Sequence, residues 1–259
     1  MIKELIVRFV PTTIHPTDVQ GRCVVMADIL RASTTIVQAL ASGANAVFPQ
    51  AEIEDSQKLA RELGQGTLVG GERNGQIVPG FDQGNSPLEY TPEIIGGKNL
   101  VLCTTNGTYT LTHCRSASRV LIGAFVNLTA ICQQLAEHES AMIACAGTNR
   151  SVTDEDVLFA GAVASKLQKH NAEIYLNDAA RIAAARWESM QSKLANEPLW
   201  KIFALSHGGR NLMRLGYEHD VKFCAEIDMF SVVPELDLEK WVITTASWLT
   251  NAAEPTSQN

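Results

Sequence analysis

Short apolar runs alternate with longer amphipathic segments along most of this chain. The runs CVVMA (23–27), NLVLC (99–103) and AMIAC (141–145) are each followed by a segment with apolar residues at helical spacing. These runs are apolar throughout, without strict alternation, which is typical of strands buried on both faces of a sheet. A strand followed by a helix, repeated about five or six times, predicts a three-layer α/β/α fold with a mostly parallel sheet.

The C-terminal third has a different pattern. The stretch DAARIAAARWESMQSKL combines good helix formers with apolar residues at helical spacing, which predicts a long helix. Residues 198–216 predict one further helix or a pair, broken at Gly208-Gly209, and residues 221–236 return to strand-like composition. The helical segment over residues 172–220 either forms an inserted lobe or covers the sheet.

No linker rich in Gly, Ser or Pro divides the chain. We therefore expect a single domain over residues 1–250, followed by a flexible tail over residues 251–259. The 259 residues, 46% of them hydrophobic, allow a large core. The six cysteines form no C-x-x-C pair, and we interpret them as reduced core residues.

Charge and hydropathy exclude some classes of protein. The net charge is −7, with no basic run of five or more residues, which argues against a nucleic-acid binder. No apolar run reaches the roughly 18 residues that a membrane helix needs, so we expect no membrane partner. The opening MIKELIVRFVP lacks the layout of a signal peptide, and we expect a cytoplasmic protein. The sequence is compatible with a homo-oligomer without specifying one.

Polar side chains gather directly after the strand-like runs. Ligands of parallel sheets bind beyond the carboxyl ends of the strands, where such residues from several strands meet. The candidates after successive runs are Asp28, Arg31, Ser33, Thr34, Thr35, Glu72, Arg73, Asn74, Thr104, Thr105, Asn106, Gly107, Thr108, Asn127, Thr148, Asn149, Arg150, Asp154, Glu155 and Asp156. Some have structural alternatives, because Asn127 and Asp154 are common helix N-cap types and Asp28 could pair with Arg31.

The carboxylates of this set predict a metal site. Several carboxylates on one rim repel one another, and a bound divalent cation offsets that cost. Because the set offers oxygen ligands and no His or Cys cluster, Mg²⁺ is favoured over zinc. We expect the Mg²⁺ ligands among Asp28, Glu72, Glu155 and Asp156.

The same edge of the sheet predicts a site for a small anionic phosphorylated substrate. The stretch TTNGT (104–108) offers hydroxyls, an amide and backbone N–H groups at a helix start, which suit phosphoryl oxygens. Arginines fork onto carboxylate, sulfonate or phosphate groups. We expect catalytic roles for Asp28, Arg31, Glu72 and Arg73. We expect the substrate ligands to be Thr34, Thr35, Thr104, Thr105, Asn106, Gly107, Thr108, Asn127 and Arg150, with Arg210 as an alternative to Arg150.

Motifs that are missing narrow the choice further. The chain has no G-x-G-x-x-G and no G-x-x-x-x-G-K-[ST], which argues against a dinucleotide-binding dehydrogenase and a P-loop protein. It has no G-x-S-x-G either, and Ser206-His207 lacks the context of a nucleophile elbow. The sequence favours a structural role for His207 and does not place Asp228.

Seven motifs along the chain together resemble the 2-phosphosulfolactate phosphatase family. They run in order from about Val24 to Pro234 and read ADILRASTTI, GGERNG, GNSPLEY, TTNGT, GAFVN, TDEDVLFAGA and FCAEIDMFSVVP. The resemblance implies Mg²⁺-dependent hydrolysis of (R)-2-phospho-3-sulfolactate to 3-sulfolactate and phosphate, which in archaea belongs to coenzyme M biosynthesis. The alternatives are a phosphatase of another small phosphorylated hydroxy acid and a non-catalytic binder of phosphorylated metabolites.

Two mechanisms stay open at this point. Metal-bound water could attack phosphorus with a carboxylate as base, or Asp28 could act as a nucleophile and form an aspartyl phosphate. The D-x-D arrangement of haloacid-dehalogenase-like phosphatases is absent, because residue 30 is Leu. Attack by water is therefore favoured.

Overall fold

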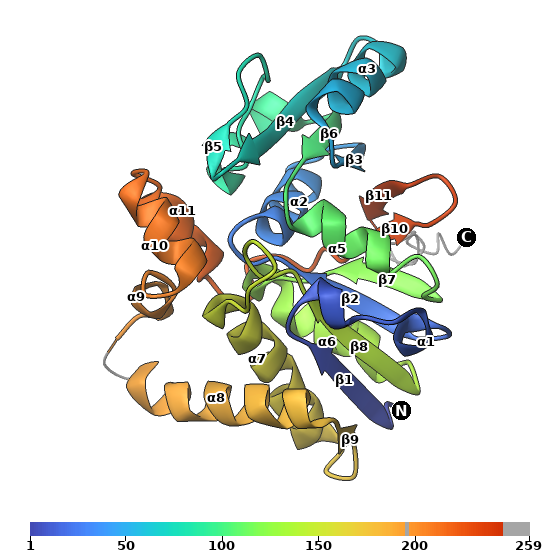
Figure 1. Ribbon diagram of the computed structural model, residues 1–259, viewed down its shortest axis with the longest axis vertical. Coiled ribbons are helices and arrows are strands. Elements are labelled where there is room, and N and C mark those ends of the chain that lie inside the picture. The colour runs from blue at the N-terminus through green and yellow to red at the C-terminus, as the bar shows by residue number, and fades with distance from the viewer. Residues whose placement is uncertain (195–196, 246–259) are drawn as a thin grey trace, which may run out of the picture.

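The computed structural model describes residues 1–194 and 197–245. Within them the strands form one mixed sheet in the order β5-β4-β6-β3-β11-β10-β7-β2-β8-β1-β9 (Figure 1). Helices cover the sheet on both sides, so the predicted α/β class with a mostly parallel sheet is confirmed. The predicted flexible tail lies outside the described residues, and the single domain over residues 1–250 stays a prediction.

The sheet contains two parallel blocks of strands. The larger block consists of β7 (Arg119–Ile122), β2 (Cys23–Ala27), β8 (Ser140–Cys145), β1 (Glu4–Arg8) and β9 (Tyr175–Leu176). The smaller block consists of β4 (Thr67–Arg73), β6 (Asn99–Cys103) and β3 (Ala46–Gln50), with β5 (Gln76–Ile77) antiparallel to β4. Every residue of β2 is buried, as a strand with no polar face requires.

A C-terminal hairpin joins the two blocks. It consists of β10 (Pro234–Asp237) and β11 (Val242–Thr245), which pair antiparallel with each other, with β7 and with β3. Three antiparallel pairings in a row separate the two blocks, so in a flat sheet the strands of one block would run opposite to those of the other. The carboxyl ends of both blocks nevertheless line one pocket. The sheet therefore bends at the hairpin, where pairing is short, and Figure 1 shows the blocks diverging from it.

The helices lie between and beside the strands as the alternating pattern predicts. The α-helices of the described residues are α1 (Pro16–Val19), α2 (Ala32–Ala41), α3 (Ile53–Leu63), α4 (Pro92–Ile95), α5 (Gly107–His113), α6 (Leu128–Ala136), α7 (Asp154–His170), α8 (Asp178–Leu194), α9 (Leu199–Phe203), α10 (His207–Arg214) and α11 (Glu218–Cys224). Short 3-10 helices are η1 (Pro11–Thr13), η2 (Pro87–Glu89) and η3 (Phe125–Asn127). Within the described residues, no helix combines the length and the apolar character that crossing a membrane requires.

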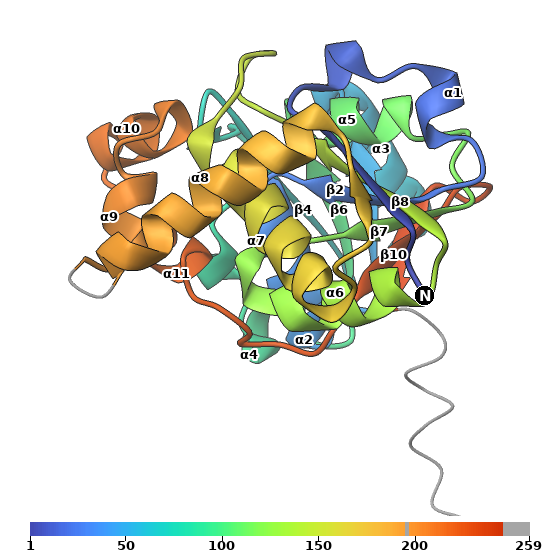
Figure 2. The same ribbon diagram turned by 90° about the horizontal axis from the view of Figure 1, so that it is seen from below.

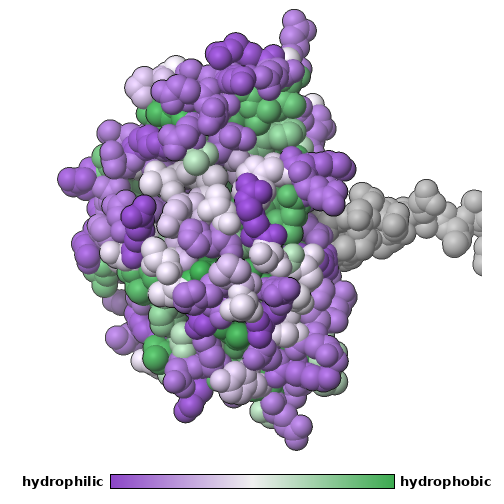
Figure 3. Space-filling view, turned by 45° about the vertical axis from the view of Figure 1, so that its right-hand side comes forward, coloured by the Kyte–Doolittle hydropathy of each residue, from purple (hydrophilic) through white to green (hydrophobic). Residues whose placement is uncertain are grey.

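Alternate residues of β2 enter two different hydrophobic cores. Val25 faces the larger core, whose aromatic centre is Phe125 with Phe159, Trp187 and Phe203, under α6, α7 and α8. Val24 faces the second core, which takes side chains from both strand blocks. The surface seen in Figure 3 is mostly hydrophilic, with apolar residues in scattered patches. All six cysteines are free and buried, as predicted.

The C-terminal third differs from the prediction in two places. The chain breaks before His207, and Gly208-Gly209 lies inside α10, where Ser206 Oγ accepts a hydrogen bond from Gly209 N–H (2.9 Å). A Cβ on Gly209 would come within 1.8 Å of the carbonyl oxygen of Phe203, so close packing requires this glycine inside the helix. Residues 221–224 belong to α11, and the expected strand begins only at Pro234.

Candidate functional site

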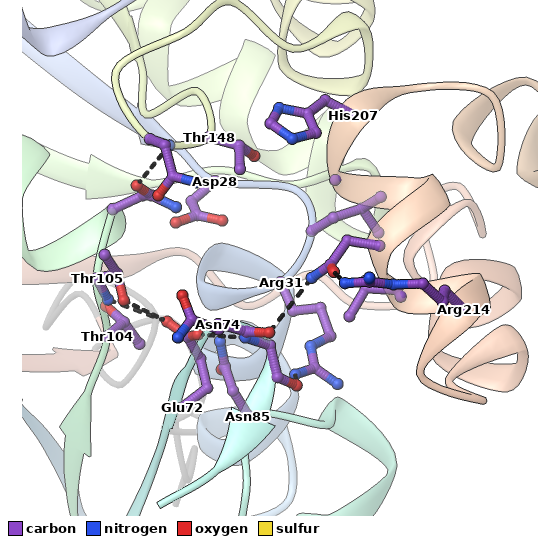
Figure 4. Close-up of a pocket in the computed structure, with 17 residues that line it drawn as sticks. Asp28, Arg31, Glu72, Asn74, Asn85, Thr104, Thr105, Thr148, His207 and Arg214 are labelled. Carbon is purple, nitrogen blue, oxygen red and sulfur yellow. Dashed lines mark hydrogen bonds between the residues drawn. The ribbon is translucent and has the colours of Figure 1, made fainter.

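A polar pocket of about 340 Å³ opens between the strand ends and helix α10 (Figure 4). The carboxyl ends of β2, β4, β6 and β8 contribute its first wall, and α10 contributes the second. Its lining residues are Asp28, Leu30, Arg31, Glu72, Asn74, Gly75, Asn85, Thr104, Thr105, Asn106, Thr148, Asn149, His207, Gly208, Asn211, Leu212 and Arg214. The structure thus brings residues far apart in sequence into one pocket.

Asp28 follows β2 directly and is only 6% exposed. Its Oδ1 accepts a hydrogen bond from Ala32 N–H (3.3 Å) at the start of α2. A Cβ on Gly107 would lie 3.2 Å from Oδ2, so this glycine leaves room beside the carboxylate. Burial, together with the nearby carboxylates of Asp156, Glu72 and Glu155, raises the pKa of Asp28 well above its usual range. A neighbouring cation would favour its charged form.

Glu72 is the penultimate residue of β4 and holds two loops of the strand-end wall in place. Its Oε1 accepts hydrogen bonds from Thr105 N–H (3.1 Å) and from the Thr105 hydroxyl (3.0 Å). Its Oε2 accepts a hydrogen bond from Gly75 N–H (2.8 Å) in the turn between β4 and β5. Figure 4 shows the Glu72 carboxylate between these loops at the lower edge of the pocket.

The TTNGT stretch divides into residues that face the pocket and residues that support it. Thr104, Thr105 and Asn106 line the pocket, and α5 begins at Gly107. Thr108 turns inward, where its N–H donates to Thr104 Oγ1 (3.2 Å) and its hydroxyl donates to the carbonyl oxygen of Gln50 (3.1 Å). The polar stretch after β6 therefore contributes three residues to the pocket lining and one buried threonine, Thr108, whose hydrogen bonds hold the loop in place.

Two of the four predicted metal ligands lie behind the pocket. Asp156 uses both oxygens on protein donors, since Oδ1 accepts from Ile29 N–H (2.9 Å) and Oδ2 from Gly147 N–H (2.8 Å). Glu155 is 1% exposed, and among the described residues its Oε2 finds no hydrogen-bond partner. Burial and the Asp156 carboxylate raise the pKa of Glu155 to about 8.

Asp28 and Glu72 are thus the predicted metal ligands whose side chains line the pocket. Over residues 1–194 and 197–245, no three His, Cys, Asp or Glu side chains are already grouped around one metal position. Mg²⁺ is commonly bound by one or two carboxylates plus waters and substrate phosphate oxygens. The two hard carboxylates at the pocket fit that requirement.

Arg31 lines the pocket, but its guanidinium is committed to protein partners. Nη1 donates to the Asp220 carboxylate on α11, and Nη2 donates to the carbonyl oxygen of Gly75 (2.8 Å). The group also lies 4.5 Å from the ring centroid of Tyr217. Asp220 in turn accepts a hydrogen bond from the Ser86 hydroxyl (2.6 Å). Arg31 therefore links the strand-end wall to α11.

A family model described as 2-phosphosulpholactate phosphatase matches residues 8–239. The chain belongs to this family. Proteins named "Probable 2-phosphosulfolactate phosphatase" from Thermotoga petrophila and Thermotoga maritima are 43% and 41% identical to it, each over 84% of this chain and 90% of the relative. One from Caldanaerobacter subterraneus subsp. tengcongensis is 35% identical, over 86% of this chain and 91% of the relative. The predicted resemblance is confirmed, together with the enzyme class of phosphoric monoester hydrolases.

Two arginines that the sequence predicts at the site, Arg73 of the GGERNG motif and Arg150, which lies outside the seven motifs, are turned away from the pocket. Arg73 donates to the carbonyl oxygens of Glu72 and Ala51. Arg150 lies 5.3 Å from the ring centroid of Tyr109 and is absent from the lining, although Asn149 beside it is present. Neither arginine lines the pocket, because a side chain's direction depends on contacts that its sequence position does not reveal, and their predicted roles at the substrate stay predictions.

Other residues of the family motifs are hydrogen-bonded within the protein, and the predicted substrate contacts of Thr34, Thr35 and Asn127 stay predictions. The hydroxyls of Thr34 and Thr35 are buried and donate to the carbonyl oxygens of Ile29 (3.0 Å) and Asn85 (2.9 Å). Asn127 is fully buried, accepts from Ala124 N–H and donates to the carbonyl oxygens of Ile122 and Val232. Asp228 accepts hydrogen bonds from the backbone and hydroxyl of Thr129 at α6, outside the pocket.

The second wall of the pocket was missed by sequence reasoning. His207, Asn211 and Arg214 of α10 line it, whereas Arg210 donates to the carbonyl oxygen of Leu205 and lies outside. The signal was the spacing of positions 207, 211 and 214, which places the three residues on one helical face. Because the sequence predicts a break at Gly208-Gly209, it does not predict a continuous helix over these three positions.

Proposed function

We propose that this chain hydrolyses (R)-2-phospho-3-sulfolactate to 3-sulfolactate and phosphate in a Mg²⁺-dependent reaction. The observation that carries the proposal is the meeting of Asp28 and Glu72 with Thr104, Thr105 and Asn106 in one pocket at the strand ends. Membership of the 2-phosphosulpholactate phosphatase family and the printed names of the relatives support the choice of substrate. The cytoplasmic location and the link with coenzyme M biosynthesis stay predictions.

Asp28 and Glu72 would hold Mg²⁺ together with water and oxygens of the substrate. The donor set supports this, because both groups are carboxylates and Asp28 is buried among other acidic side chains. When bound, the ion supplies Lewis-acid polarisation of the phosphoryl oxygens and lowers the free energy of the charge that develops on them. Asp156 contributes through its charge from behind the pocket, whereas the raised pKa of Glu155, about 8, favours its neutral form near pH 7.

The chain's own residues orient the phosphoryl group and accept the proton of the attacking water. The Thr104 hydroxyl and the Asn106 side-chain amide line the pocket that contains Asp28 and bind phosphoryl oxygens there, while Thr105 donates its N–H and hydroxyl to Glu72. Oδ2 of Asp28 accepts the proton of the attacking water while the bond from phosphorus to the substrate oxygen breaks, and the leaving oxygen takes up a proton from solvent water to become the hydroxyl of 3-sulfolactate. A cation held beside Asp28 would keep its carboxylate ionised, which is the form that accepts a proton.

Release of inorganic phosphate tests this proposal. The purified chain is assayed with (R)-2-phospho-3-sulfolactate and with phospholactate, each in Mg²⁺ and in EDTA. We expect turnover of the first substrate that EDTA abolishes and added Mg²⁺ restores. Tight binding of phosphate without turnover would instead identify a non-catalytic binder, and faster turnover of phospholactate would identify a phosphatase of another hydroxy acid.

Rapid-quench trapping with substrate labelled on phosphorus separates the two mechanisms. Attack by water leaves no label on the protein at any time during the first turnover. A covalent phosphoenzyme that maps to Asp28 would contradict the role of Asp28 as base and assign it as the nucleophile.

A further inference from the structure

We propose that α10 recognises a second acidic group of the substrate through Arg214, supported by Asn211. This inference rests on the proposed phosphatase function, because it assigns the non-phosphoryl end of the same substrate. Figure 4 shows His207 and Arg214 on the helix across the pocket from Asp28, Glu72 and Thr105. The acidic wall suits a metal-bound phosphoryl group, and the opposite wall presents the cationic and amide donors that suit a carboxylate or sulfonate.

Among the arginines near the pocket, Arg214 both lines it and keeps N–H donors for a ligand. Arg31 lines the pocket but is buried against Asp220 and the carbonyl oxygen of Gly75. Arg73 and Arg150 are turned away from the pocket, as is Arg210. Within the described residues, the Arg214 guanidinium donates only to Oδ1 of Asn211 (2.9 Å), so it keeps N–H donors for a ligand.

The contact of α10 with the β4–β5 turn orients the exposed Arg214 side chain without burying it. Asn211 Nδ2 donates to the carbonyl oxygen of Asn74 (3.3 Å) while its Oδ1 holds Arg214. A Cβ on Gly75 would lie 2.9 Å from that Asn211 amide nitrogen, which shows how closely the turn approaches the helix. The amide thus aligns the guanidinium with the pocket, and a planar guanidinium binds carboxylate or sulfonate oxygens in a bidentate manner.

Three substrates that differ only in their acidic groups test the assignment. They are (R)-2-phospho-3-sulfolactate, phospholactate without the sulfonate, and isopropyl phosphate without either acid. The variants are Arg214→Gln, Arg214→Lys and the control Arg210→Gln, which removes an exposed arginine on the same helix. Loss of one charge-assisted contact should lower kcat/KM of Arg214→Gln by roughly 10- to 100-fold, mainly through KM.

The losses of each variant with the three substrates show whether Arg214 recognises an acidic group. We expect Arg214→Gln to be impaired with phosphosulfolactate and unchanged with isopropyl phosphate, with Arg214→Lys intermediate and Arg210→Gln like wild type. An added loss with phospholactate identifies the recognised acid as the carboxylate, and a loss confined to phosphosulfolactate identifies the sulfonate. Equal losses with all three substrates, or no difference between Arg214→Gln and Arg210→Gln, would overturn the proposal.

Calorimetric binding of 3-sulfolactate keeps this test separate from the phosphatase assay. Wild type and Arg210→Gln should bind it with the same affinity, and Arg214→Gln roughly 10- to 100-fold more weakly. If wild type released no phosphate from any substrate, the proposed function would fail while this binding experiment still examined Arg214. Equal binding by all variants would contradict the recognition role.

Discussion

The two walls of the pocket are built in different ways. At the strand ends the side chains are held by hydrogen bonds to backbone groups, as Glu72 is by Thr105 and Gly75, and Asp28 is 6% exposed. On α10 the lining side chains of His207 and Arg214 are exposed. The difference assigns the two walls different tasks, because chemistry needs groups that are fixed before the substrate arrives, whereas recognition tolerates a side chain that adjusts.

The walls also meet at one buried ion pair. Arg31 belongs to the strand-end wall and Asp220 to α11, which follows α10 directly in the chain. Ser86 and Tyr217 contact the same pair. The alignment of the recognition wall with the catalytic wall therefore depends on a few buried polar contacts as well as on apolar packing.

The largest effect is expected from removing the charge of Asp28. Asp28→Asn keeps the shape of the side chain but removes a proton acceptor and a metal ligand, so kcat should fall roughly 10²- to 10⁴-fold. Steady-state kinetics with phosphosulfolactate measure the loss, and circular dichroism checks the fold. The control Asp228→Asn changes an aspartate outside the pocket and should keep kcat. Activity of Asp28→Asn equal to wild type would remove Asp28 from the catalytic wall.

The ion pair between the walls should contribute most to stability. Asp220→Asn leaves the buried Arg31 guanidinium without its charged partner, which should lower the free energy of unfolding by about 3–5 kcal/mol. Urea unfolding measures this change. Glu139→Gln removes the partner of Lys3 in an exposed pair and should change stability little. Equal effects of the two substitutions would refute the link between the walls.

The carboxylates behind the strand-end wall predict a dependence of stability on pH. The pKa of Glu155 is raised to about 8 in the folded chain, from an ordinary 4.5, by burial and by Asp156. The folded state therefore binds more protons than the unfolded state between these values, and stability contributed by Glu155 is lost as pH rises through about 8.

Glu155→Gln should remove this part of the pH dependence. In EDTA, the free energy of unfolding of wild type should fall between pH 6 and pH 9 more steeply than that of the variant, as measured by urea unfolding. The substitution Glu62→Gln, on the exposed side of α3, provides the control. Parallel pH profiles for wild type and Glu155→Gln would contradict a raised pKa at this position.

The smallest effect concerns the contact between α10 and the β4–β5 turn. Gly75 and Gly216 have similar positive φ values of 85° and 86°, but a Cβ on Gly75 would meet Asn211 whereas one on Gly216 would meet open space. Both alanine variants should lose about 1–2 kcal/mol from the left-handed backbone. Gly75→Ala alone should also raise KM for phosphosulfolactate, since it displaces Asn211. The same KM for both variants would argue against this contact as the support of Arg214.

The strand-end wall could be predicted from the sequence, and the α10 wall could not. Asp28, Glu72 and Thr104 each follow an apolar run directly, and parallel strands bring such positions to one edge. Tertiary contacts set the direction of a side chain next to such a position, and the sequence does not reveal them. The sequence therefore predicts Arg73 and Arg150 in the pocket, whereas the structure places neither of them in its lining. The face that α10 turns toward the pocket depends on its packing against the β4–β5 turn, more than 130 residues away in sequence.

A crystal structure of the chain with Mg²⁺, phosphate and 3-sulfolactate tests the division of the pocket most directly. The account predicts the metal on the carboxylates of Asp28 and Glu72, the phosphate against Thr104 and Asn106, and an acidic group of 3-sulfolactate on Arg214. Phosphate bound to α10, with the carboxylates of Asp28 and Glu72 far from both metal and ligand, would contradict it.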